Sequence, residues 1–487
     1  MQRFLNQLKA APLRAISVGF VLLAAVLMPA ADLQIYASNP WQEIGRMGVG
    51  LITPRWESLT ELAMAIAQTI AFALLGVVGS VIAGLALTRF YHLRIVRVFC
   101  ASIRAVHELF WALIFMQIFG LSALTGLLAI ALPYSGIFAK VFSEIFSQQP
   151  VLPAISIAGK SNKLPFSAWL YTQFAQALPQ IRSYTRYRFE CALRSSTLLG
   201  FVGLPTLGFY FETAFKQGQY SEAACLLWCF YLLIASLRYW LHWRIIPLYI
   251  IAAWLILPES PPLINSYVWQ FFSRDIWPVE LIQGDYLGAL RWYGVELRET
   301  IFPAAAYTLI ISIIALVATG LLTLLLYPAA SNKFAGKFTI LGHSVLLFFR
   351  STPEFVLAFV LLLLFGPSAL PAIIALAIHN SGLISYLIAR HSNDLSLRPD
   401  ALRGLNLYCY EVTPRLYPAF MGLLLYRWEV IMRETAILGI LGVTTLGFYV
   451  DSAFEEIRYD RALLLVATAA FMNIIVDSLS RRLARAC

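Results

Sequence analysis

Charged side chains are scarce in this sequence. Asp, Glu, Lys and Arg make up 13% of its 487 residues, whereas a soluble globular domain carries about a quarter. Apolar residues account for 60%, and the mean hydropathy is +0.74. Several apolar runs reach the roughly 20 residues that a helix needs to cross about 30 Å of hydrocarbon. A large soluble enzyme is therefore excluded, and the sequence predicts an all-α protein that crosses a membrane many times.

Cysteine is also sparse. No four of the cysteines have the spacing of a zinc site, and no disulfide framework is visible. Cys225 and Cys229 are one helical turn apart in an apolar stretch, where free thiols pack as small hydrophobic groups. We therefore expect no metal site and no bound cofactor. The six positions are Cys100, Cys191, Cys225, Cys229, Cys409 and Cys487.

A complete nucleotide-binding loop is missing. The stretch AISIAGKS at 154–161 resembles the end of a phosphate-binding loop, but Ala154 stands where the first glycine belongs, and no strand-then-helix unit surrounds it. No cluster of His, Asp, Glu or Cys supports covalent chemistry. We therefore expect that the chain is not an enzyme, and that any ATP driving it is hydrolysed by a separate polypeptide.

Hydropathy predicts about twelve membrane spans, of which the third and seventh are the shortest. They are expected at roughly 14–36, 62–88, 106–120, 122–145, 184–208, 221–240, 244–257, 300–327, 338–365, 368–389, 420–448 and 461–481.

The net charge of +10 is explained by the positions of Lys and Arg. On a soluble protein it would suggest nucleic acid, but here the basic residues occupy alternate loops, which the positive-inside rule assigns to the cytoplasm. We therefore expect the chain in a bacterial inner membrane, with both termini and the loops 146–183 and 390–418 on its cytoplasmic side. The acidic, aromatic stretch 258–299 is expected outside, and no nucleic-acid partner is expected. A cleaved signal peptide at the first span stays open, because a basic stretch precedes that run.

The sequence repeats itself. Residues 187–220 match 426–459 without a gap, 239 positions later, and the block from Arg104 matches the block from Arg350 at an offset of 246. Both copies run in the same direction. This predicts two related halves around a pseudo-twofold axis along the membrane normal, with a path between them. The expected boundaries are 1–240 for the first half, 241–299 for a short span plus an external connection, and 300–487 for the second half.

A long cytoplasmic loop precedes the fifth span of each half. Apolar residues recur at helical spacing in 164–180 and in 398–418, and a proline follows each stretch. This pattern predicts a short amphipathic helix that the proline closes. Such a helix could dock into a groove on a partner, or it could be an ordinary interfacial helix.

These loops resemble the coupling loop of ABC importer permeases, whose pattern is an acidic residue, Ala, a later Gly and a terminal Leu-Pro. The blocks HELFWALIF, YRFE with LGFVG, and YRWEV with LGILG resemble permeases of phosphonate and phosphite importers. The resemblance implies a fused type I ABC importer permease that works by alternating access. It also implies two cytoplasmic ABC ATPase subunits, a periplasmic or surface binding protein, and a phosphorus oxyanion as substrate. The coupling residues it implies are Leu178, Pro179, Asp400, Ala401, Gly404 and Pro418.

Two repeated segments are candidates for the pathway or gate. GFVGLPTLGF and GILGVTTLGF could break a helix and expose backbone N–H groups to an oxyanion, or their glycines could serve close helix packing. Their candidate residues are Gly200, Gly203, Thr206, Gly208, Gly439, Gly442, Thr444, Thr445 and Gly447.

A repeated set of charges lies at the start of the fifth span of each half. It is interpreted as a structural ion-pair cluster or as part of an inner gate. Glu434 has no counterpart, because Ser195 stands at its place in the first copy. His379 and Asn380 are replaced by Pro133 and Tyr134, and a lone buried histidine is more often a structural hydrogen-bonding group than a ligand. The charged residues are Arg188, Glu190, Arg194, Arg427, Glu429, Arg433 and Glu434.

Other functions remain open at this point. An ion-coupled secondary transporter of a small anion would also show repeats and intramembrane charge, but it would not need two long cytoplasmic amphipathic loops. An ABC permease for a different small solute would share every feature above except the substrate.

Overall fold

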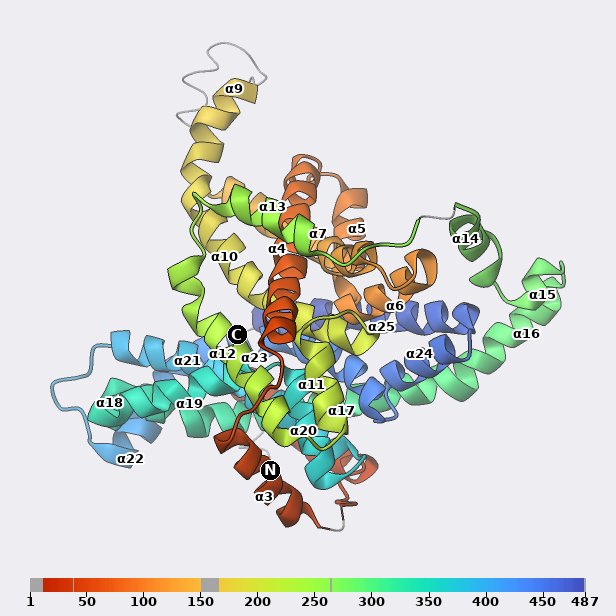
Figure 1. Cartoon of the computed structure of the whole chain (residues 1–487). Coiled ribbons are helices and arrows are strands. Elements are labelled where there is room, and N and C mark those ends of the chain that lie inside the picture. The colour runs from red at the N-terminus through yellow and green to blue at the C-terminus, as the bar shows by residue number, and fades with distance from the viewer. Residues whose placement is uncertain (1–11, 38, 150–165, 263–264, 486–487) are drawn as a thin grey trace. The chain divides into compact units, whose positions relative to one another are not determined.

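The computed structural model describes residues 12–37, 39–149, 166–262 and 265–485, and every regular element in these ranges is helical (Figure 1). Seven of the described helices are long and apolar enough to cross a membrane, or up to ten if each of three bent pairs is one span. An all-α, multi-pass membrane protein is therefore confirmed, but the full set of twelve spans is not. The expected seventh span forms α13 (Ile246–Ile256), whose 11 residues extend about 16 Å, too short to cross the hydrocarbon.

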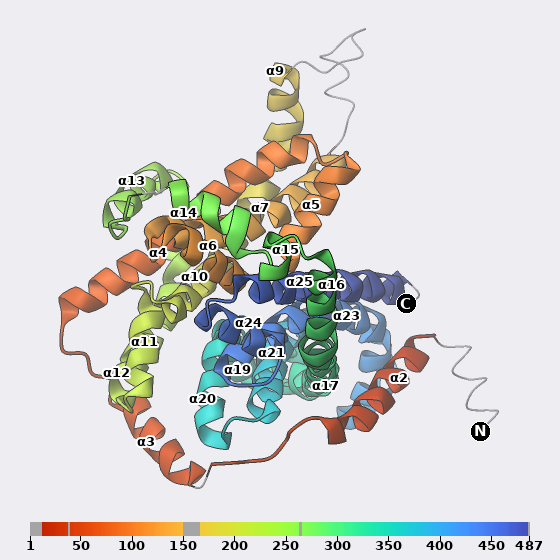
Figure 2. The ribbon, with the colours of Figure 1, turned by 90° about the vertical axis from the view of Figure 1, so that its right-hand side faces the viewer.

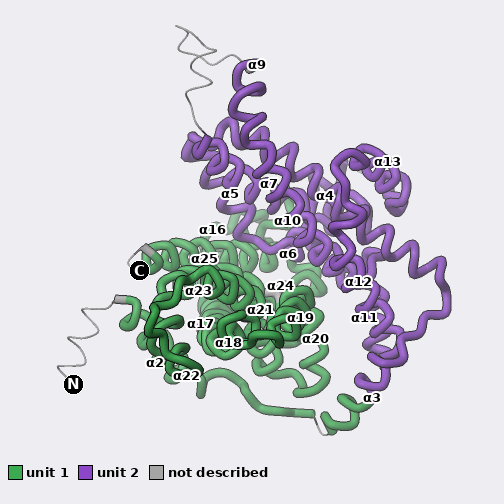
Figure 3. Tube along the Cα trace, turned by 90° about the vertical axis from the view of Figure 1, so that its left-hand side faces the viewer, with its two compact units in different colours: residues 1–45, 272–487 green, residues 46–271 purple. Residues whose placement is uncertain are grey.

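The chain divides into two compact units, shown in different colours in Figure 3. Unit 1 comprises residues 1–45 and 272–487, and unit 2 comprises residues 46–271. The other helices of unit 2 are α4 (Leu59–Arg89), α5 (Arg94–Ala105), α6 (Glu108–Phe119), α7 (Ala123–Ser147), α9 (Phe166–Trp169), α10 (Ala175–Leu198), α11 (Leu207–Lys216), α12 (Tyr220–Trp240) and α14 (Asn265–Gln270). Those of unit 1 are α2 (Pro12–Leu27), α15 (Val279–Ile282), α16 (Tyr286–Glu296), α17 (Phe302–Leu326), α18 (Asn332–Ala335), α19 (Thr339–Ser351), α20 (Glu354–Phe365), α21 (Ala369–Asp394), α22 (Gly404–Leu407), α23 (Thr413–Ile437), α24 (Leu446–Glu455) and α25 (Tyr459–Arg485), while α3 (Pro40–Ile52) crosses the boundary.

In unit 2, α4 packs along α7 through small residues. A Cβ atom added to Gly76 would lie 2.8 Å from the Ile130 side chain, and one added to Gly84 would lie 2.6 Å from Phe138. Glycine at these places lets the two backbones approach closely, as is common between helices in membranes. Fully buried aromatic rings, among them Phe72 and Phe138, fill the core around this contact.

The N-terminal helix α2 belongs to unit 1 and lies alongside α17 (Figure 2). The Tyr417 hydroxyl of α23 donates to Ser17 Oγ at 2.6 Å. The segment after α2 crosses the end of α20, where the Tyr36 N–H donates to the Phe365 carbonyl at 2.7 Å. The Asp32 carboxylate accepts a hydrogen bond from the Tyr36 hydroxyl and thereby raises the pKa of Tyr36 above its ordinary value.

Two helix pairs turn through a right angle at matching places in the two units. α5 and α6 meet at 92°, and the helical segment Asn332–Ser351, which ends with α19, meets α20 at 91°. At the first bend, His107 Nδ1 accepts the Leu109 N–H and so caps α6. The span expected at 338–365 is therefore bent within its length: the helix breaks before Pro353, which has no N–H to continue the helix and disfavours helical geometry in the residue before it.

The loops 164–180 and 398–418, which the sequence analysis expects to contact the ATPases, are called the first and second coupling loops. Their prolines do not close the loop helices as expected. Pro179 lies inside α10 and Pro418 lies inside α23. One π-helical turn precedes each of them, at Leu170–Phe174 and at Tyr408–Val412. A proline ring crowds the carbonyl four residues earlier, and here that carbonyl comes just after the wider π turn, which absorbs the distortion. The loop helices therefore run without interruption into α10 and α23.

Candidate functional site

α10 and α23 each end in a 3-10 turn that is followed by a left-handed glycine. Gly203 has φ of 94° and Gly442 has φ of 91°, and α11 and α24 begin a few residues later. We call 199–206 and 438–445 the first and second glycine turns. The break in the helix that the sequence predicts is present in both.

Each glycine turn is tied to a neighbouring helix by the same hydrogen bond. In unit 2, the Leu207 N–H donates to Thr69 Oγ1 of α4 at 2.9 Å. In unit 1, the Leu446 N–H donates to Thr308 Oγ1 of α17 at 3.0 Å. Both threonines are fully buried, and each donates its own hydroxyl to the carbonyl four residues earlier. A threonine of one helix thus caps the start of another, which holds the turn in place.

Close backbone contacts account for the glycines of these turns. A Cβ atom on Gly200 would lie 2.1 Å from the Phe209 nitrogen, and one on Gly208 would lie 1.8 Å from the Thr197 oxygen. Gly439 is crowded in the same way, at 2.1 Å from a backbone nitrogen of α24 and beside Gly447. The structure therefore supplies a packing reason for glycine here, which was one of the two interpretations of the sequence.

The backbone donors of the glycine turns are largely used within the protein. The N–H groups of Gly203 and Thr206 donate to carbonyls of the first turn, and those of Gly442 and Thr445 do the same in the second. The hydroxyls differ: Thr206 Oγ1 is buried without a hydrogen-bond partner, whereas its counterpart Thr445 donates to the Ala436 carbonyl at 3.5 Å and the adjacent Thr444 is exposed. A role of these segments in binding an oxyanion stays a prediction, and it rests on hydroxyls more than on N–H groups.

The second coupling loop has a defined conformation. The buried Glu411 carboxylate accepts the Arg398 N–H at 3.0 Å, and the Arg415 guanidinium lies 3.6 Å from the same carboxylate. Arg415 also donates to the Ser396 carbonyl at 2.8 Å. These contacts fasten the loop to the start of α23. The expected coupling residues here are Asp400, Gly404 and Pro418, which are exposed, and Ala401, which is half-buried.

The first coupling loop is described only from Phe166 onwards. Its expected residues lie on α10, where Leu178 is half-buried and Pro179 is exposed. The stretch 154–161, which resembles part of a phosphate-binding loop, lies outside the described residues.

The repeated charges are not arranged alike in the two units. In unit 2, tyrosines surround the Arg188 guanidinium. Its Nε donates to the Tyr184 hydroxyl at 2.8 Å, and the guanidinium lies over the rings of Tyr134, Tyr184 and Tyr187 at 5.3 to 5.7 Å. Such cation–π contacts stabilise a charge that has left water. The remaining members are the half-buried Glu190, Arg194, Arg427, Glu429 and Arg433, and the buried Glu434.

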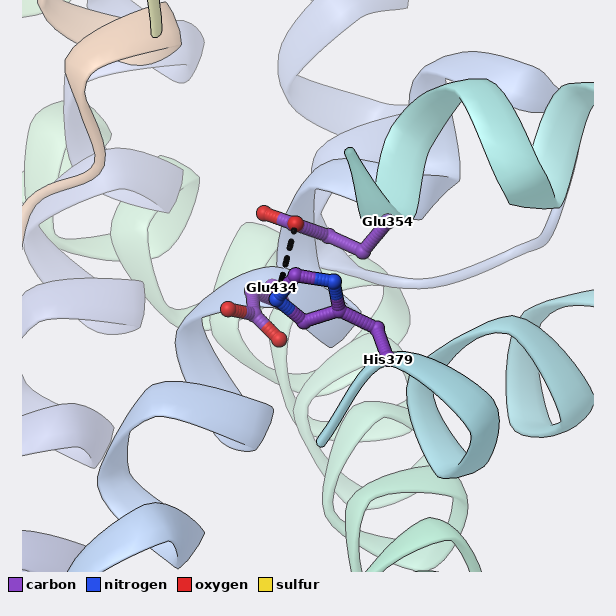
Figure 4. Close-up of side chains that lie close together, drawn as sticks. All are labelled: Glu354, His379 and Glu434. Carbon is purple, nitrogen blue, oxygen red and sulfur yellow. Dashed lines mark ion pairs between the residues drawn. The ribbon is translucent and has the colours of Figure 1, made fainter. Parts of the chain in front are cut away.

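A glutamate lies just after the right-angle bend of each unit, buried in unit 2 and half-buried in unit 1. In unit 2, Glu108 Oε1 accepts a hydrogen bond from Ser195 Oγ at 2.6 Å, and Tyr134 lies 3.1 Å from the same serine. In unit 1, Glu354, His379 and Glu434 converge from α20, α21 and α23 (Figure 4). Among the described residues, these three form the group whose ligand atoms could hold a metal ion.

The sequence analysis missed both glutamates of the bends. Glu108 and Glu354 occupy the same place in the repeat at the offset of 246, which was the available signal. Glu434 and His379 were noticed separately, but nothing in a linear sequence shows that residues 55 positions apart share a site.

Comparison with known proteins places the chain in a family. It is 25% identical over 476 residues to the phosphate-import permease protein PhnE of Mycolicibacterium smegmatis, which covers 88% of this chain and 86% of that protein. It is 32% identical over 133 residues to the phosphite transport system permease protein PtxC of Stutzerimonas stutzeri, covering 27% of this chain and 48% of that protein. A cryptic phosphonate transport system permease protein, PhnE2 of Escherichia coli K12, is 31% identical over 102 residues, covering 21% of this chain and 82% of that protein.

No family model and no solved structure matches the chain. One permease relative nevertheless covers 88% of the chain, and a permease agrees with the multi-pass helical fold. The chain belongs to the permease family of phosphonate and phosphite ABC importers, as a membrane-embedded translocation subunit rather than an enzyme.

Proposed function

We propose that this chain forms the transmembrane pathway of an ATP-driven importer for a small phosphorus oxyanion: a phosphonate, phosphite or a related anion such as phosphate. The observation that carries the proposal is similarity over 88% of the chain to a phosphate-import permease. Two further relatives are named for phosphite and phosphonate. These anions share a tetrahedral phosphorus with negatively charged oxygens, so the chemical class is better supported than any single member.

The two parts of the chain are proposed to be tandem copies of one permease half, 1–240 and 300–487, joined by 241–299, with about twelve spans in all. Three recurrences support this. The right-angle bends agree within a degree, a π turn precedes a proline in α10 and in α23, and the threonine-capped glycine turn occurs 239 residues apart.

The continuity of the loop helices suggests how force crosses the membrane. α10 has 24 residues and α23 has 25, so each is about 36 Å long and joins a coupling loop directly to a glycine turn. A helix of that length transmits a push along its axis. The threonine bonds to α4 and α17 then carry the movement into the neighbouring spans. Alternating access would follow when the two halves tilt in opposite directions.

The partners follow from the same arrangement. Two cytoplasmic ABC ATPase subunits are proposed to grip the two coupling loops, because the loop helix occurs twice. A periplasmic or surface binding protein is proposed to deliver the anion at the face that carries 258–299. The chain would lie in a bacterial inner membrane with both termini in the cytoplasm, and no nucleic acid takes part.

Uptake in a strain that lacks its other phosphorus importers tests the proposal. The chain is expressed with its ATPase and binding protein, and growth is measured on phosphonates, phosphite or phosphate as sole phosphorus source. Growth on at least one of them is expected, and it should vanish when the ATPase carries a substitution that prevents ATP hydrolysis. Growth on none of them would contradict the substrate class.

The rival function is an ion-coupled secondary transporter. It predicts uptake that persists with the inactive ATPase and collapses when the ion gradient is dissipated. Uptake that follows ATP hydrolysis in proteoliposomes without an ion gradient would exclude it.

A further inference from the structure

Three side chains of unit 1 converge in a buried place between α20, α21 and α23 (Figure 4). His379 and Glu434 are 2% and 6% exposed, and the Glu354 side chain is 16% exposed. His379 Nε2 lies 3.6 Å from Glu354 Oε2, and one ligand atom from each of the three residues lies within 4.8 Å of the others.

The histidine presents a lone pair to the carboxylate. His379 Nδ1 lies 2.9 Å from the Thr352 carbonyl oxygen, which can only accept, so Nδ1 carries the proton. The neutral ring then has an unprotonated Nε2, and this nitrogen faces Glu354. Two acceptors that face each other in a buried site require a cation between them, either a proton or a metal ion.

The other unit shows the opposite arrangement at the matching place. His107 Nδ1 accepts the Leu109 N–H, so its Nε2 carries the proton and donates towards Glu108, 3.6 Å away. Ser195 Oγ donates to the other oxygen of the same carboxylate. Glu108 is therefore satisfied by protein donors, and no added cation is needed there.

The sequence shows how this difference arises. At the offset of 246, His107 aligns with Pro353 and Pro133 aligns with His379, so the histidine and the proline have exchanged places. A histidine Nε2 faces the glutamate in both units, but the histidine comes from a different segment of the unit and its Nε2 is in the opposite protonation state. Glu434 replaces Ser195 at the same time and adds a second carboxylate.

The charges of Glu354 and Glu434 give a second reason to expect a cation. Two carboxylates this close together and away from water do not both ionise without a compensating charge. Arg427 and Arg433 of α23 act on Glu434 and offset part of its charge. A divalent ion between Glu354 and Glu434 would neutralise both at once, with the neutral imidazole as a third ligand.

A neighbouring amide belongs to the same cluster. The Asn380 amide nitrogen donates to Glu434 Oε2 at 3.1 Å and to the Leu376 carbonyl at 3.0 Å. Asn380 is 0% exposed, and its Oδ1 has no hydrogen-bond partner. An orphaned buried carbonyl oxygen costs free energy unless something occupies it, and oxygen atoms of this type are among those that bind metal ions.

We propose that Glu354, His379 and Glu434 bind one divalent transition-metal ion, with Zn²⁺ as the best match to their ligand chemistry. Ligands at about 2.1 Å from a tetrahedral ion lie about 3.4 Å apart, close to the 3.6 Å between His379 Nε2 and Glu354 Oε2. The bond from Nδ1 to a carbonyl is the orienting contact that metal-binding histidines usually make. The ion ties the helix after the bend to α21 and to α23, four residues before the second glycine turn, and so stiffens that end of α23.

The test uses the full chain in detergent, with any affinity tag removed and metal stripped by a chelator. Cobalt(II) serves as a visible probe and Zn²⁺ as a competitor, in a Cys409→Ser background because Cys409 is an exposed thiol. We expect one Co²⁺ per chain, a visible absorption band that Zn²⁺ abolishes, and a higher unfolding temperature with Zn²⁺.

Glu434→Ser is the main variant, because the repeat already carries serine at that place without loss of the fold. It and His379→Gln should weaken Co²⁺ binding at least tenfold. Glu108→Gln in unit 2 is the matched control and should leave binding unchanged. The proposal is overturned if the chain binds no Co²⁺, if binding survives both unit 1 variants, or if Glu108→Gln weakens it equally. The first of these outcomes would leave a shared proton as the cation of the cluster.

Discussion

At the scale of single residues, the threonine cap is the contact that ties local structure to function. Thr308 donates its hydroxyl along its own helix and accepts the Leu446 N–H from another. Leu446 is fully buried, so its N–H has no access to water. One oxygen atom therefore satisfies the start of α24 and fixes the second glycine turn against α17. The same reasoning holds for Thr69 and the first glycine turn.

Replacing Thr308 with valine should destabilise the protein. The substitution keeps the shape but leaves the buried Leu446 N–H without an acceptor, which costs about 1–3 kcal/mol. We expect a lower unfolding temperature in detergent and reduced uptake. Thr308→Ser keeps the hydroxyl and serves as the control. Equal stability of the valine and serine variants would show that the cap contributes nothing.

The crowded glycines give a second residue-scale prediction. Gly439→Ala would place a Cβ atom 2.1 Å from the Phe448 nitrogen, so the glycine turn must shift or the chain misfolds. Gly422→Ala, in the middle of α23, has nothing within 4 Å of the added carbon and should be neutral or stabilising by about 0.5–1 kcal/mol. The amount of folded protein in the membrane and its unfolding temperature separate the two. Similar behaviour of both variants would contradict the packing explanation.

At the scale of helices, hydropathy predicted where most apolar segments lie but not how they bend. Along 338–365 two apolar runs flank the polar stretch 350–354, and the chain turns through a right angle there. The opposite error occurred at Pro418, where a proline was expected to end a helix but the preceding π turn let the helix continue. Hydropathy shows whether a segment can lie in the hydrocarbon of a membrane. The backbone hydrogen bonds determine where the helix continues and where it bends.

The candidate site, too, could be predicted from the sequence only in part. The glycine turns were visible in the sequence because their spacing repeats, and the helix breaks there as expected. The cluster of Glu354, His379 and Glu434 was not visible, because its members come from three helices and only the fold brings them together. The tautomer of His379 depends further on one carbonyl, Thr352, that no sequence pattern marks.

The continuity of α23 leads to a prediction about coupling. Gly422→Pro should kink α23 between its coupling loop and its glycine turn, because a proline inside a helix costs about 3 kcal/mol and redirects the axis. We expect at least tenfold slower uptake while the ATPase subunits still bind. Gly422→Ala at the same position is the control and should transport normally. Normal uptake by the proline variant, with protein levels unchanged, would refute a rigid connection.

At the scale of the whole molecule, recurrence and divergence occur together. The bends, π turns and threonine caps recur at fixed offsets, and we expect the two proposed halves to share one mechanical plan. The buried clusters diverge, since a serine stands in unit 2 where Glu434 stands in unit 1. The two halves should therefore respond differently to equivalent substitutions, even though their backbones follow the same course.

The distribution of charge gives the last prediction, the orientation of the chain in the membrane. Basic loops face the cytoplasm, so 390–418 should lie inside and the acidic stretch 258–299 outside. Exposed thiols report the side directly. Ser392 is an unsuitable probe because it is fully buried and lies 2.9 Å from Ser331 Oγ, whereas Cys409 and Ser266 are exposed.

An impermeant thiol reagent applied to intact cells should therefore leave Cys409 unlabelled and should label it after the membrane is opened. Ser266→Cys in a Cys409→Ser background should be labelled in intact cells, and the Cys409→Ser chain alone supplies the background from the remaining cysteines. The positive-inside rule acts through many loops at once, so both probes must agree. Labelling of Cys409 in intact cells without labelling at position 266 would show that the chain has the opposite orientation. The face proposed to meet the ATPase would then be outside.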